Sequence, residues 1–185
     1  MRRLAAAFGL VFCLAAATAA AQATASAETA TEALTAFGIL GTWSPDCGGP
    51  IRVTYAARSG AGPISSAVID GAEQAVAEIK EAARVGADQI HWTSVYKKYS
   101  PLDVAKQAWM PEPGEVWETL LVKLGDKIRS LQSQRLDGQK VLVRDGFYYA
   151  ADDSVPGRPI LWRRTDQATP LFGRCPGNAA SASPR

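Results

Sequence analysis

Hydrophobic and polar residues alternate along residues 115–150 with the two-residue period of a β-strand. Leu120 and Val122 fall on one face of an extended chain, and Thr119 and Lys123 fall on the other. Such alternation is typical of antiparallel strands that have one face buried and one face in solvent. The pattern therefore predicts half-buried antiparallel strands in this part of the chain.

Three dipeptides divide this stretch and predict tight turns between its strands: Gly125-Asp126, Asp137-Gly138 and Asp145-Gly146. Asp-Gly supplies the positive φ angles of a type I′ turn, and glycine at the first position suits a type II′ turn. Four strands in an antiparallel meander are the simplest arrangement that fits these turns.

Shorter alternating stretches occur elsewhere and bring the expected count to eight or nine short strands. They cover residues 39–43, 50–58, 64–70, 89–98 and 158–164. Many short strands favour a sandwich or a barrel, and consecutive tight hairpins favour an up-and-down barrel over a Greek-key sandwich. We therefore predict an all-β, mainly antiparallel domain: a single lipocalin-like barrel of about eight strands, with one or two short helices.

Residues 71–85 carry conflicting signals. Asp70 and Glu73 have the spacing of a capping box, and Gly86 stands where a helix would end. The alternative is a strand that pairs with residues 89–98. Because tertiary context often overrides local propensity, the surrounding meander favours the strand.

A second helix is predicted just after Ser100, where Pro101 would occupy the first helical position. It would end before the "MPEPG" stretch and place Trp109 near its end. This helix is either a lid over the barrel mouth, a permanent plug, or a docking patch if Trp109 is exposed. The plug is favoured.

The first residues of the chain resemble a secretory signal peptide. Arg2 and Arg3 form a basic head, residues 4–17 are almost wholly apolar, and Ala19-Ala20-Ala21 fits a signal-peptidase site. The apolar run is too short to span a membrane. We therefore expect residues 1–21, with Cys13, to be removed, so that the protein would meet a membrane only through this cleaved segment.

The remainder divides by composition into three parts. Residues 22–36 are rich in Ala, Thr and Glu and are expected to form a flexible lead-in. Residues 176–185 are small and polar and predict a disordered tail. Residues 37–175 are expected to be the barrel domain, which is long enough to bury a core.

Removal of the leader changes the charge and the cysteine count. The formal net charge of +2 comes from Arg2 and Arg3, so the mature chain would carry equal numbers of basic and acidic residues. Without an excess of positive charge, nucleic acid is not an expected partner. Two cysteines would remain, Cys47 and Cys175, and in an oxidising compartment they are expected to form a disulfide. The protein is thus expected to be periplasmic or secreted.

No group of residues predicts catalysis or a metal site. His91 is the only histidine, so a multi-histidine site cannot form, and its position in a strand indicates an outward-facing side chain. Asp152-Asp153 is the only acidic doublet, and adjacent strand residues point to opposite faces, which does not suit a paired-carboxylate site. We expect no enzyme activity and no cofactor.

The tryptophans are the strongest candidates for a functional site. If Trp43, Trp92, Trp117 and Trp162 point inward, they either line a ligand cavity or fill the barrel, and small barrels are often filled by their own side chains. A filled core is favoured, and the cavity stays open as an alternative.

The stretch Gly41-Thr42-Trp43 resembles the start of lipocalin and calycin barrels, which begin with Gly-x-Trp after a short helical turn. The segment "EALTAFGIL" before it is suitable for that turn. The resemblance implies that Trp43 packs under an arginine of the last strand, for which Arg163 and Arg164 are the candidates. The family's Thr-Asp-Tyr motif is missing, because Gln167 follows Thr165-Asp166.

The chain also resembles small uncharacterised secreted proteins of alphaproteobacteria. They share the pattern "GTW..DC" near the front, Asp-Gly hairpins in the middle and a terminal "RC", which match residues 41–47, Asp145-Gly146 and Arg174-Cys175. That resemblance implies an exported β-protein and no particular activity.

The sequence therefore predicts an exported, non-enzymatic protein that binds a small apolar ligand in its barrel. The candidate ligand-binding residues are Trp92, Trp109, Trp117 and Tyr148. The alternative is an envelope protein-interaction module, an inhibitor or an assembly factor, that docks a protein partner through residues 100–113.

Overall fold

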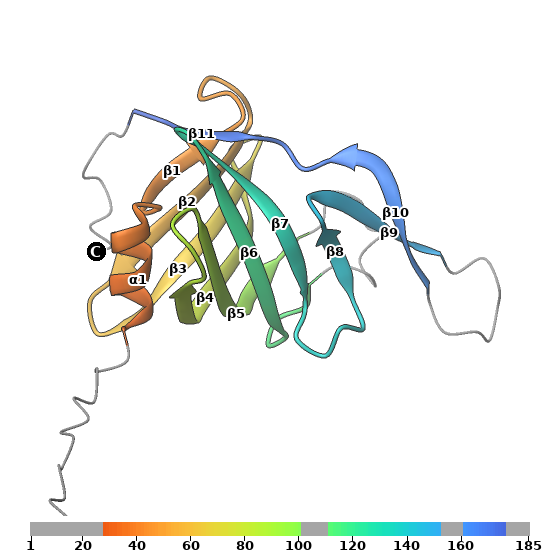
Figure 1. Ribbon diagram of the computed structural model, residues 1–185, viewed down its shortest axis with the longest axis horizontal. Helices are drawn as coiled ribbons and strands as arrows, with labels where there is room; N and C mark the ends of the chain where they lie inside the picture. The colour runs from red at the N-terminus through yellow and green to blue at the C-terminus, as the bar shows by residue number, and fades with distance from the viewer. Residues whose placement is uncertain (1–27, 101–110, 153–160, 177–185) are drawn as a thin grey trace, which may run out of the picture.

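The computed structural model describes residues 28–100, 111–152 and 161–176, and these form one helix and eleven strands (Figure 1). In chain order they are α1 (Ala30–Phe37), β1 (Gly41–Ser44), β2 (Ile51–Arg58), β3 (Ala61–Ile69), β4 (Ala72–Arg84), β5 (Gln89–Tyr99), β6 (Val116–Leu124), β7 (Lys127–Arg135), β8 (Val141–Arg144), β9 (Phe147–Asp152), β10 (Leu161–Ala168) and β11 (Phe172–Arg174). All strand pairings among these residues are antiparallel.

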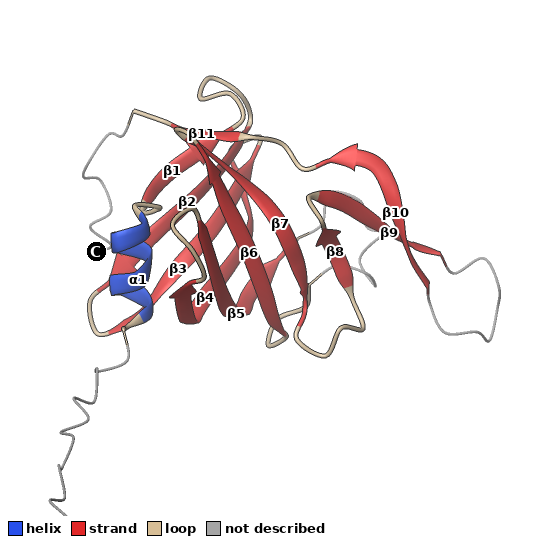
Figure 2. Ribbon diagram, viewed as in Figure 1, coloured by secondary structure: helices blue, strands red, loops and turns tan. Residues whose placement is uncertain are grey.

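Eight of these strands close into a barrel. Their order is β11-β1-β2-β3-β4-β5-β6-β7, and the pairing of β7 with both β6 and β11 completes the ring. Figure 2 shows strands forming the whole wall, with α1 beside it. The prediction of an all-β, antiparallel barrel of about eight strands is therefore confirmed.

Strand β7 changes its partner along one edge. Near its start, Lys127 and Ile128 pair with β11, whereas Ser133 and Gln134 further along pair with β8. Strands β8, β9 and β10 consequently continue outside the barrel as a three-stranded extension, here called the wing (Figure 1). The wing was not expected, because a closed meander would have kept these strands in the barrel.

The turn predictions are confirmed in two of three cases. Asp145 and Gly146 have φ angles of 54° and 74°, as a type I′ turn requires, and Gly125 has a φ of 69° between β6 and β7. Asp137-Gly138, by contrast, lies within the longer connection of residues 136–140 rather than forming a two-residue turn. The prediction of a tight hairpin there was wrong.

Residues 72–84 form strand β4, so the strand favoured for this region is confirmed. The preceding Asp70 and Gly71 have φ angles of 52° and 78° and join β3 to β4 in a further tight turn. Asp70 is therefore a turn residue and not a helix cap. Strand β4 pairs with β5 from Ala75↔Tyr99 to Arg84↔Ile90, as expected.

The helix α1 corrects the expected lead-in. The Thr29 hydroxyl accepts a hydrogen bond from the Glu32 N–H, the Glu32 carboxylate accepts one from the Thr29 N–H, and Gly38 ends the helix with a φ of 73°. Ala33, Leu34 and Phe37 of this helix are buried. Residues 30–36 are thus part of the packed domain and not a flexible segment.

The helix covers one end of the barrel interior. Leu34 and Phe37 belong to a single buried cluster with Ile79, Ile90 and Trp43, which come from strands of the wall. Lys123 donates a hydrogen bond to the Phe37 carbonyl and lies 4.5 Å from the centre of its ring. This end of the barrel is consequently closed and filled by apolar side chains.

The expected disulfide between Cys47 and Cys175 is present, with a Cα–Cα distance of 5.5 Å. It joins the loop after β1 to the residue that follows β11. Strand β11 forms only two residue pairs with β1 and two with β7, so it has the least extensive pairing of the barrel strands. The disulfide therefore fastens the strand that closes the ring.

The arginine over Trp43 is Arg174, and the expectation of Arg163 or Arg164 was wrong. The Arg174 guanidinium lies 5.6 Å from the Trp43 ring centre and donates a hydrogen bond to the Leu40 carbonyl. Trp43 and Arg174 are directly paired across β1 and β11, which places their side chains on one face. Gly41 has a φ of 129°, and a Cβ there would stand 3.2 Å from this guanidinium.

Arg163 and Arg164 lie instead on β10 in the wing. Arg163 forms an ion pair with Asp152, and Arg164 lies 3.5 Å from the centre of the Phe147 ring. Neither contacts Trp43, because β10 pairs only with β9 and is separated from β1 by four strands of the sheet order.

Candidate ligand-binding cavity

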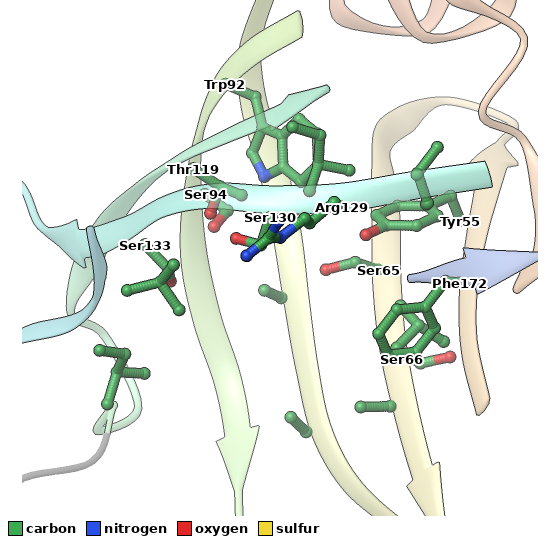
Figure 3. A pocket seen from close by; sticks show the side chains of 18 of the residues that line it. Tyr55, Ser65, Ser66, Trp92, Ser94, Thr119, Arg129, Ser130, Ser133 and Phe172 are labelled. Atoms are coloured by element: carbon green, nitrogen blue, oxygen red, sulfur yellow. The ribbon is translucent and has the colours of Figure 1, made fainter. Parts of the chain in front are cut away.

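A cavity of about 300 Å³ occupies the part of the barrel that the apolar cluster does not fill (Figure 3). Its wall comes from strands β2 to β9 and from β11. The lining residues are Val53, Tyr55, Ser65, Ser66, Ala67, Ala75, Ala77, Trp92, Ser94, Tyr96, Thr119, Leu121, Ile128, Arg129, Ser130, Ser133, Leu142, Val143, Tyr148 and Phe172.

Small side chains on β3 and β4 explain why this region is hollow. Ser65 and Ala67 on β3 and Ala75 and Ala77 on β4 all line the cavity, and they pair directly as Ser65↔Ala77 and Ala67↔Ala75. An eight-stranded barrel is just wide enough to be filled by side chains of ordinary size. Four small residues side by side on two neighbouring strands therefore leave unfilled volume.

The cavity wall has two transverse rows in which aromatic side chains accompany hydroxyl groups. In the first row, Tyr55↔Ser65, Ser65↔Ala77 and Ala77↔Tyr96 are successive cross-strand pairs from β2 to β5. The second row runs from β5 to β9 through the pairs Trp92↔Thr119, Thr119↔Ser133, Ser133↔Val143 and Val143↔Tyr148. Direct pairs share a face of the sheet, so each row presents its side chains together.

Two strands of the wing thus contribute to the cavity. Val143 of β8 and Tyr148 of β9 extend the second row beyond the barrel wall. The wing is therefore part of the site.

Several hydroxyl groups of the wall have no hydrogen-bond partner in the described part of the protein. In Figure 3 the Tyr55 and Ser65 hydroxyls point toward the middle of the cavity. Among the described residues, every side-chain nitrogen or oxygen that is fully buried has a hydrogen-bond partner. These hydroxyls therefore face the open volume, where water or a ligand can bond them.

The tyrosines of the cavity are held in their neutral form. Burial raises the pKa of the Tyr55 and Tyr96 phenols far above the ordinary value, and the proximity of Tyr96 to Tyr55 adds to the shift at Tyr55. Burial also raises the pKa of Tyr148. At neutral pH these phenols are therefore uncharged groups that can both donate and accept hydrogen bonds.

Arg129 is the only charged residue among the described residues that line the cavity. Its guanidinium donates hydrogen bonds to the Gly146 carbonyl at 2.7 Å and to the Thr169 hydroxyl at 3.1 Å. The Thr169 hydroxyl in turn donates to the Ser130 carbonyl at 2.7 Å. Arg129 consequently ties the β8–β9 turn to the edge of β7 where that strand changes partner.

A charged network lies at the end of the barrel away from α1. The Glu115 carboxylate is 2.9 Å from Arg135 and 2.8 Å from Lys140, and it accepts a hydrogen bond from Trp117 Nε1 at 3.1 Å. Partial burial opposes its ionisation, but the hydrogen bonds from Lys140, the Glu112 N–H, Arg135 and Trp117 outweigh that effect and lower its pKa to about 2. The network therefore fixes the start of β6 and the connection after β7.

Of the residues predicted to bind a ligand, Trp92 and Tyr148 line the cavity. Trp92 is 3% exposed and contacts the edge of Tyr55, with ring centres 5.7 Å apart. Trp117 does not line it: this side chain is fully buried and is bonded to Glu115. Trp109 and the helix predicted around it lie outside the described residues.

The alternatives of a filled core and a hollow barrel each describe one end of the molecule. Trp43 belongs to the filled end, and Trp92 both belongs to the apolar cluster and lines the cavity. Trp162 lies in the wing, where its ring nitrogen donates a hydrogen bond to the Gln139 carbonyl. His91 faces the outside of β5, 3.4 Å from Glu118. Asp152 pairs with Arg163, and Asp153 lies outside the described residues.

The sequence interpretation missed the hydroxyl residues of the wall. Ser94, Thr119 and Ser133 lie on strands that the sequence predicted, and their side chains line the cavity. The strand period indicates this for Ser94, which stands two residues after the inward-facing Trp92. For β6 the expected faces were reversed, because Thr119 lines the cavity whereas Leu120 pairs with the outward-facing His91.

The described residues contain no group of three or more His, Cys, Asp or Glu side chains that could hold a metal ion. No helix within them is long and apolar enough to cross a membrane. Comparisons with family models, with curated proteins and with solved structures found no match. The fold therefore defines this chain as an eight-stranded antiparallel β-barrel with one short helix and added outer strands, an architecture compatible with ligand binding.

Proposed function

We propose that this protein is an exported, non-enzymatic binding protein that holds a small molecule inside its barrel. The observation that carries the proposal is the cavity of about 300 Å³ beside a closed, filled end of the same barrel. Cavities of this size and larger are typical of small-molecule sites. The disulfide supports the assignment to an oxidising compartment outside the cytoplasm, because such bonds are rare where thiols are kept reduced.

The wall changes the expected character of the ligand. A purely apolar ligand was expected from the tryptophans, but hydroxyl groups of Ser65, Ser94, Thr119 and Ser133 accompany the apolar side chains. A ligand without polar groups would leave these hydroxyls without partners once water is displaced. The alternative of a docking module relies on residues 100–113, of which residues 101–110 lie outside the described ranges.

The proposal can be tested with a matched pair of substitutions on one strand. Ala75 lines the cavity, whereas Ala83 of the same strand is exposed and pairs with the outward-facing His91. The full-length protein, exported by its own leader and purified from the envelope, would be examined by native mass spectrometry for a retained small molecule.

We expect a bound mass on the wild type and on Ala83→Phe, and its loss on Ala75→Phe, whose phenyl group would occupy the cavity. Circular dichroism and thermal melting would verify that both variants fold. Retention of the same mass by a folded Ala75→Phe protein would place the ligand elsewhere and contradict the proposal. A wild type that carries nothing, together with no response to any added compound, would also contradict it.

A further inference from the structure

The cavity wall is nearly free of charge. Among the described residues that line it there is no Asp, Glu, Lys or His, and the one charged group among them is the Arg129 guanidinium, which donates hydrogen bonds to Gly146 and Thr169. The tyrosines are neutral at pH 7, and burial raises the pKa of their phenols further. A cationic ligand would lose its hydration on entry and meet only the like charge of Arg129. The wall therefore disfavours a cation.

The same wall offers hydrogen bonds from two sides. Tyr55, Ser65 and Tyr96 belong to the row on β2 to β5, while Thr119, Ser133 and Tyr148 belong to the row on β5 to β9. Their hydroxyls have no partner in the described part of the protein, and a hydroxyl can serve as donor or acceptor. A ligand with polar groups on opposite edges would satisfy both rows at once.

Aromatic and aliphatic surfaces complete the site. Trp92, Tyr55 and Phe172 present ring surface to the cavity, and Leu121, Ile128 and Val143 present aliphatic surface. Aromatic side chains pack well against flat rings in stacked or edge-on arrangements. Because each water molecule takes about 30 Å³ of liquid volume, the cavity holds about ten waters or a ligand with a similar number of non-hydrogen atoms.

We infer that the ligand is a ring compound of about two fused rings that carries no positive charge and has hydroxyl or carbonyl groups on opposite edges. This inference rests on the proposed function, since it names the class of molecule for the same cavity. It distinguishes that class from amines and plain hydrocarbons. The ring faces would pack between the aromatic side chains, and the polar edges would bond the two rows of hydroxyls.

The test uses five probes of one shape that differ only in polar groups: 2,6-dihydroxynaphthalene, 2-naphthol, naphthalene, 2-naphthoate and 2-naphthylmethylammonium. Their dissociation constants would be measured by isothermal titration calorimetry on the full-length mature protein. We expect affinity to rise about fivefold with each hydroxyl, the equivalent of about 1 kcal/mol per neutral hydrogen bond. The ammonium probe should bind at least about tenfold more weakly than 2-naphthol, because the only charge among the described lining residues is the positive charge of Arg129.

A second arm removes one hydroxyl from the wall. Tyr148→Phe deletes a phenol that faces the cavity, and Tyr149→Phe deletes the neighbouring phenol, which does not line it. We expect Tyr148→Phe to weaken the diol about fivefold and to leave naphthalene unchanged, whereas Tyr149→Phe should alter neither. Equal affinity for the diol in both variants would contradict a polar contact at Tyr148.

The outcomes separate this inference from the proposed function. Naphthalene binding as tightly as the diol, or 2-naphthylmethylammonium binding most tightly, would overturn the ligand class. If that binding were still lost in Ala75→Phe, the proposed function would stand. If none of the five probes bound, the ligand class would be overturned. The proposed function would then be tested independently by whether the purified protein retains a bound small molecule in native mass spectrometry.

Discussion

Glu115 is expected to account for much of the acid sensitivity of this protein. Its carboxylate is held by Arg135 at 2.9 Å and by Lys140 at 2.8 Å, and only 14% of its side chain is exposed. These contacts lower its pKa from the ordinary 4.5 to about 2. A group whose pKa is depressed by folding contributes stability that is fully present above its unfolded pKa. That contribution is lost as the pH falls through the folded pKa.

The magnitude follows from the shift. One pKa unit corresponds to about 1.4 kcal/mol, so the ionised Glu115 contributes up to about 3 kcal/mol to the free energy of unfolding. Glu115→Gln keeps the shape of the side chain but removes the charge that Arg135 and Lys140 face. We expect it to lower the free energy of unfolding at pH 7 by about 2–3 kcal/mol and to remove the corresponding loss between about pH 4.5 and pH 2.

The assay is urea denaturation followed by tryptophan fluorescence at a series of pH values from 2 to 7. The matched control is Glu112→Gln, since Glu112 pairs with the same Lys140 but is 59% exposed, and exposed pairs contribute less than about 1 kcal/mol. If Glu115→Gln showed the same decline between pH 4.5 and pH 2 as the wild type, the depressed pKa of Glu115 would be refuted.

Three further variants test the closure and the turns of the barrel. Replacing Cys47 and Cys175 with serine should lower the free energy of unfolding by about 2–4 kcal/mol, and the wild type in reducing buffer should then melt at the temperature of this variant. Arg174→Ala should cost about 1–2 kcal/mol, measured by urea denaturation, because it removes both the cation over Trp43 and the hydrogen bond to the Leu40 carbonyl. Gly71→Ala should cost about 1–2 kcal/mol by the same assay, since alanine must adopt the φ of 78° required by the turn; an unchanged midpoint would argue against that backbone conformation.

The regular part of the fold could be predicted because its signals are local. Strand alternation in residues 115–150 and the Asp145-Gly146 turn each depend on residues close together in the sequence. The Asp70-Gly71 turn has the same chemistry and would have settled residues 72–84 as a strand. The capping box of Thr29 and Glu32 was an equally local signal for α1 that the Ala-rich composition obscured.

The closure of the barrel could not be predicted in this way. Whether β7 pairs with β8 along its whole edge, or leaves part of it to β11, depends on residues that are far apart in the chain. Arg163 and Arg164 were placed over Trp43 because β10 was taken as the last barrel strand. The short β11 takes that place, and its Arg174 provides the contact.

The hollow part of the barrel explains why so many other features serve stability. An empty apolar cavity of about 300 Å³ would cost about 7 kcal/mol at the rate measured for buried cavities, which is comparable to the whole stability of a typical domain. Hydroxyl groups reduce that cost, because they allow water to occupy the space before a ligand arrives. The disulfide, the helix over the filled end and the Glu115 network lie outside the cavity wall, so they stabilise the barrel without filling it. Substitutions in the wall should therefore change binding more than stability, and substitutions in these three features should do the opposite.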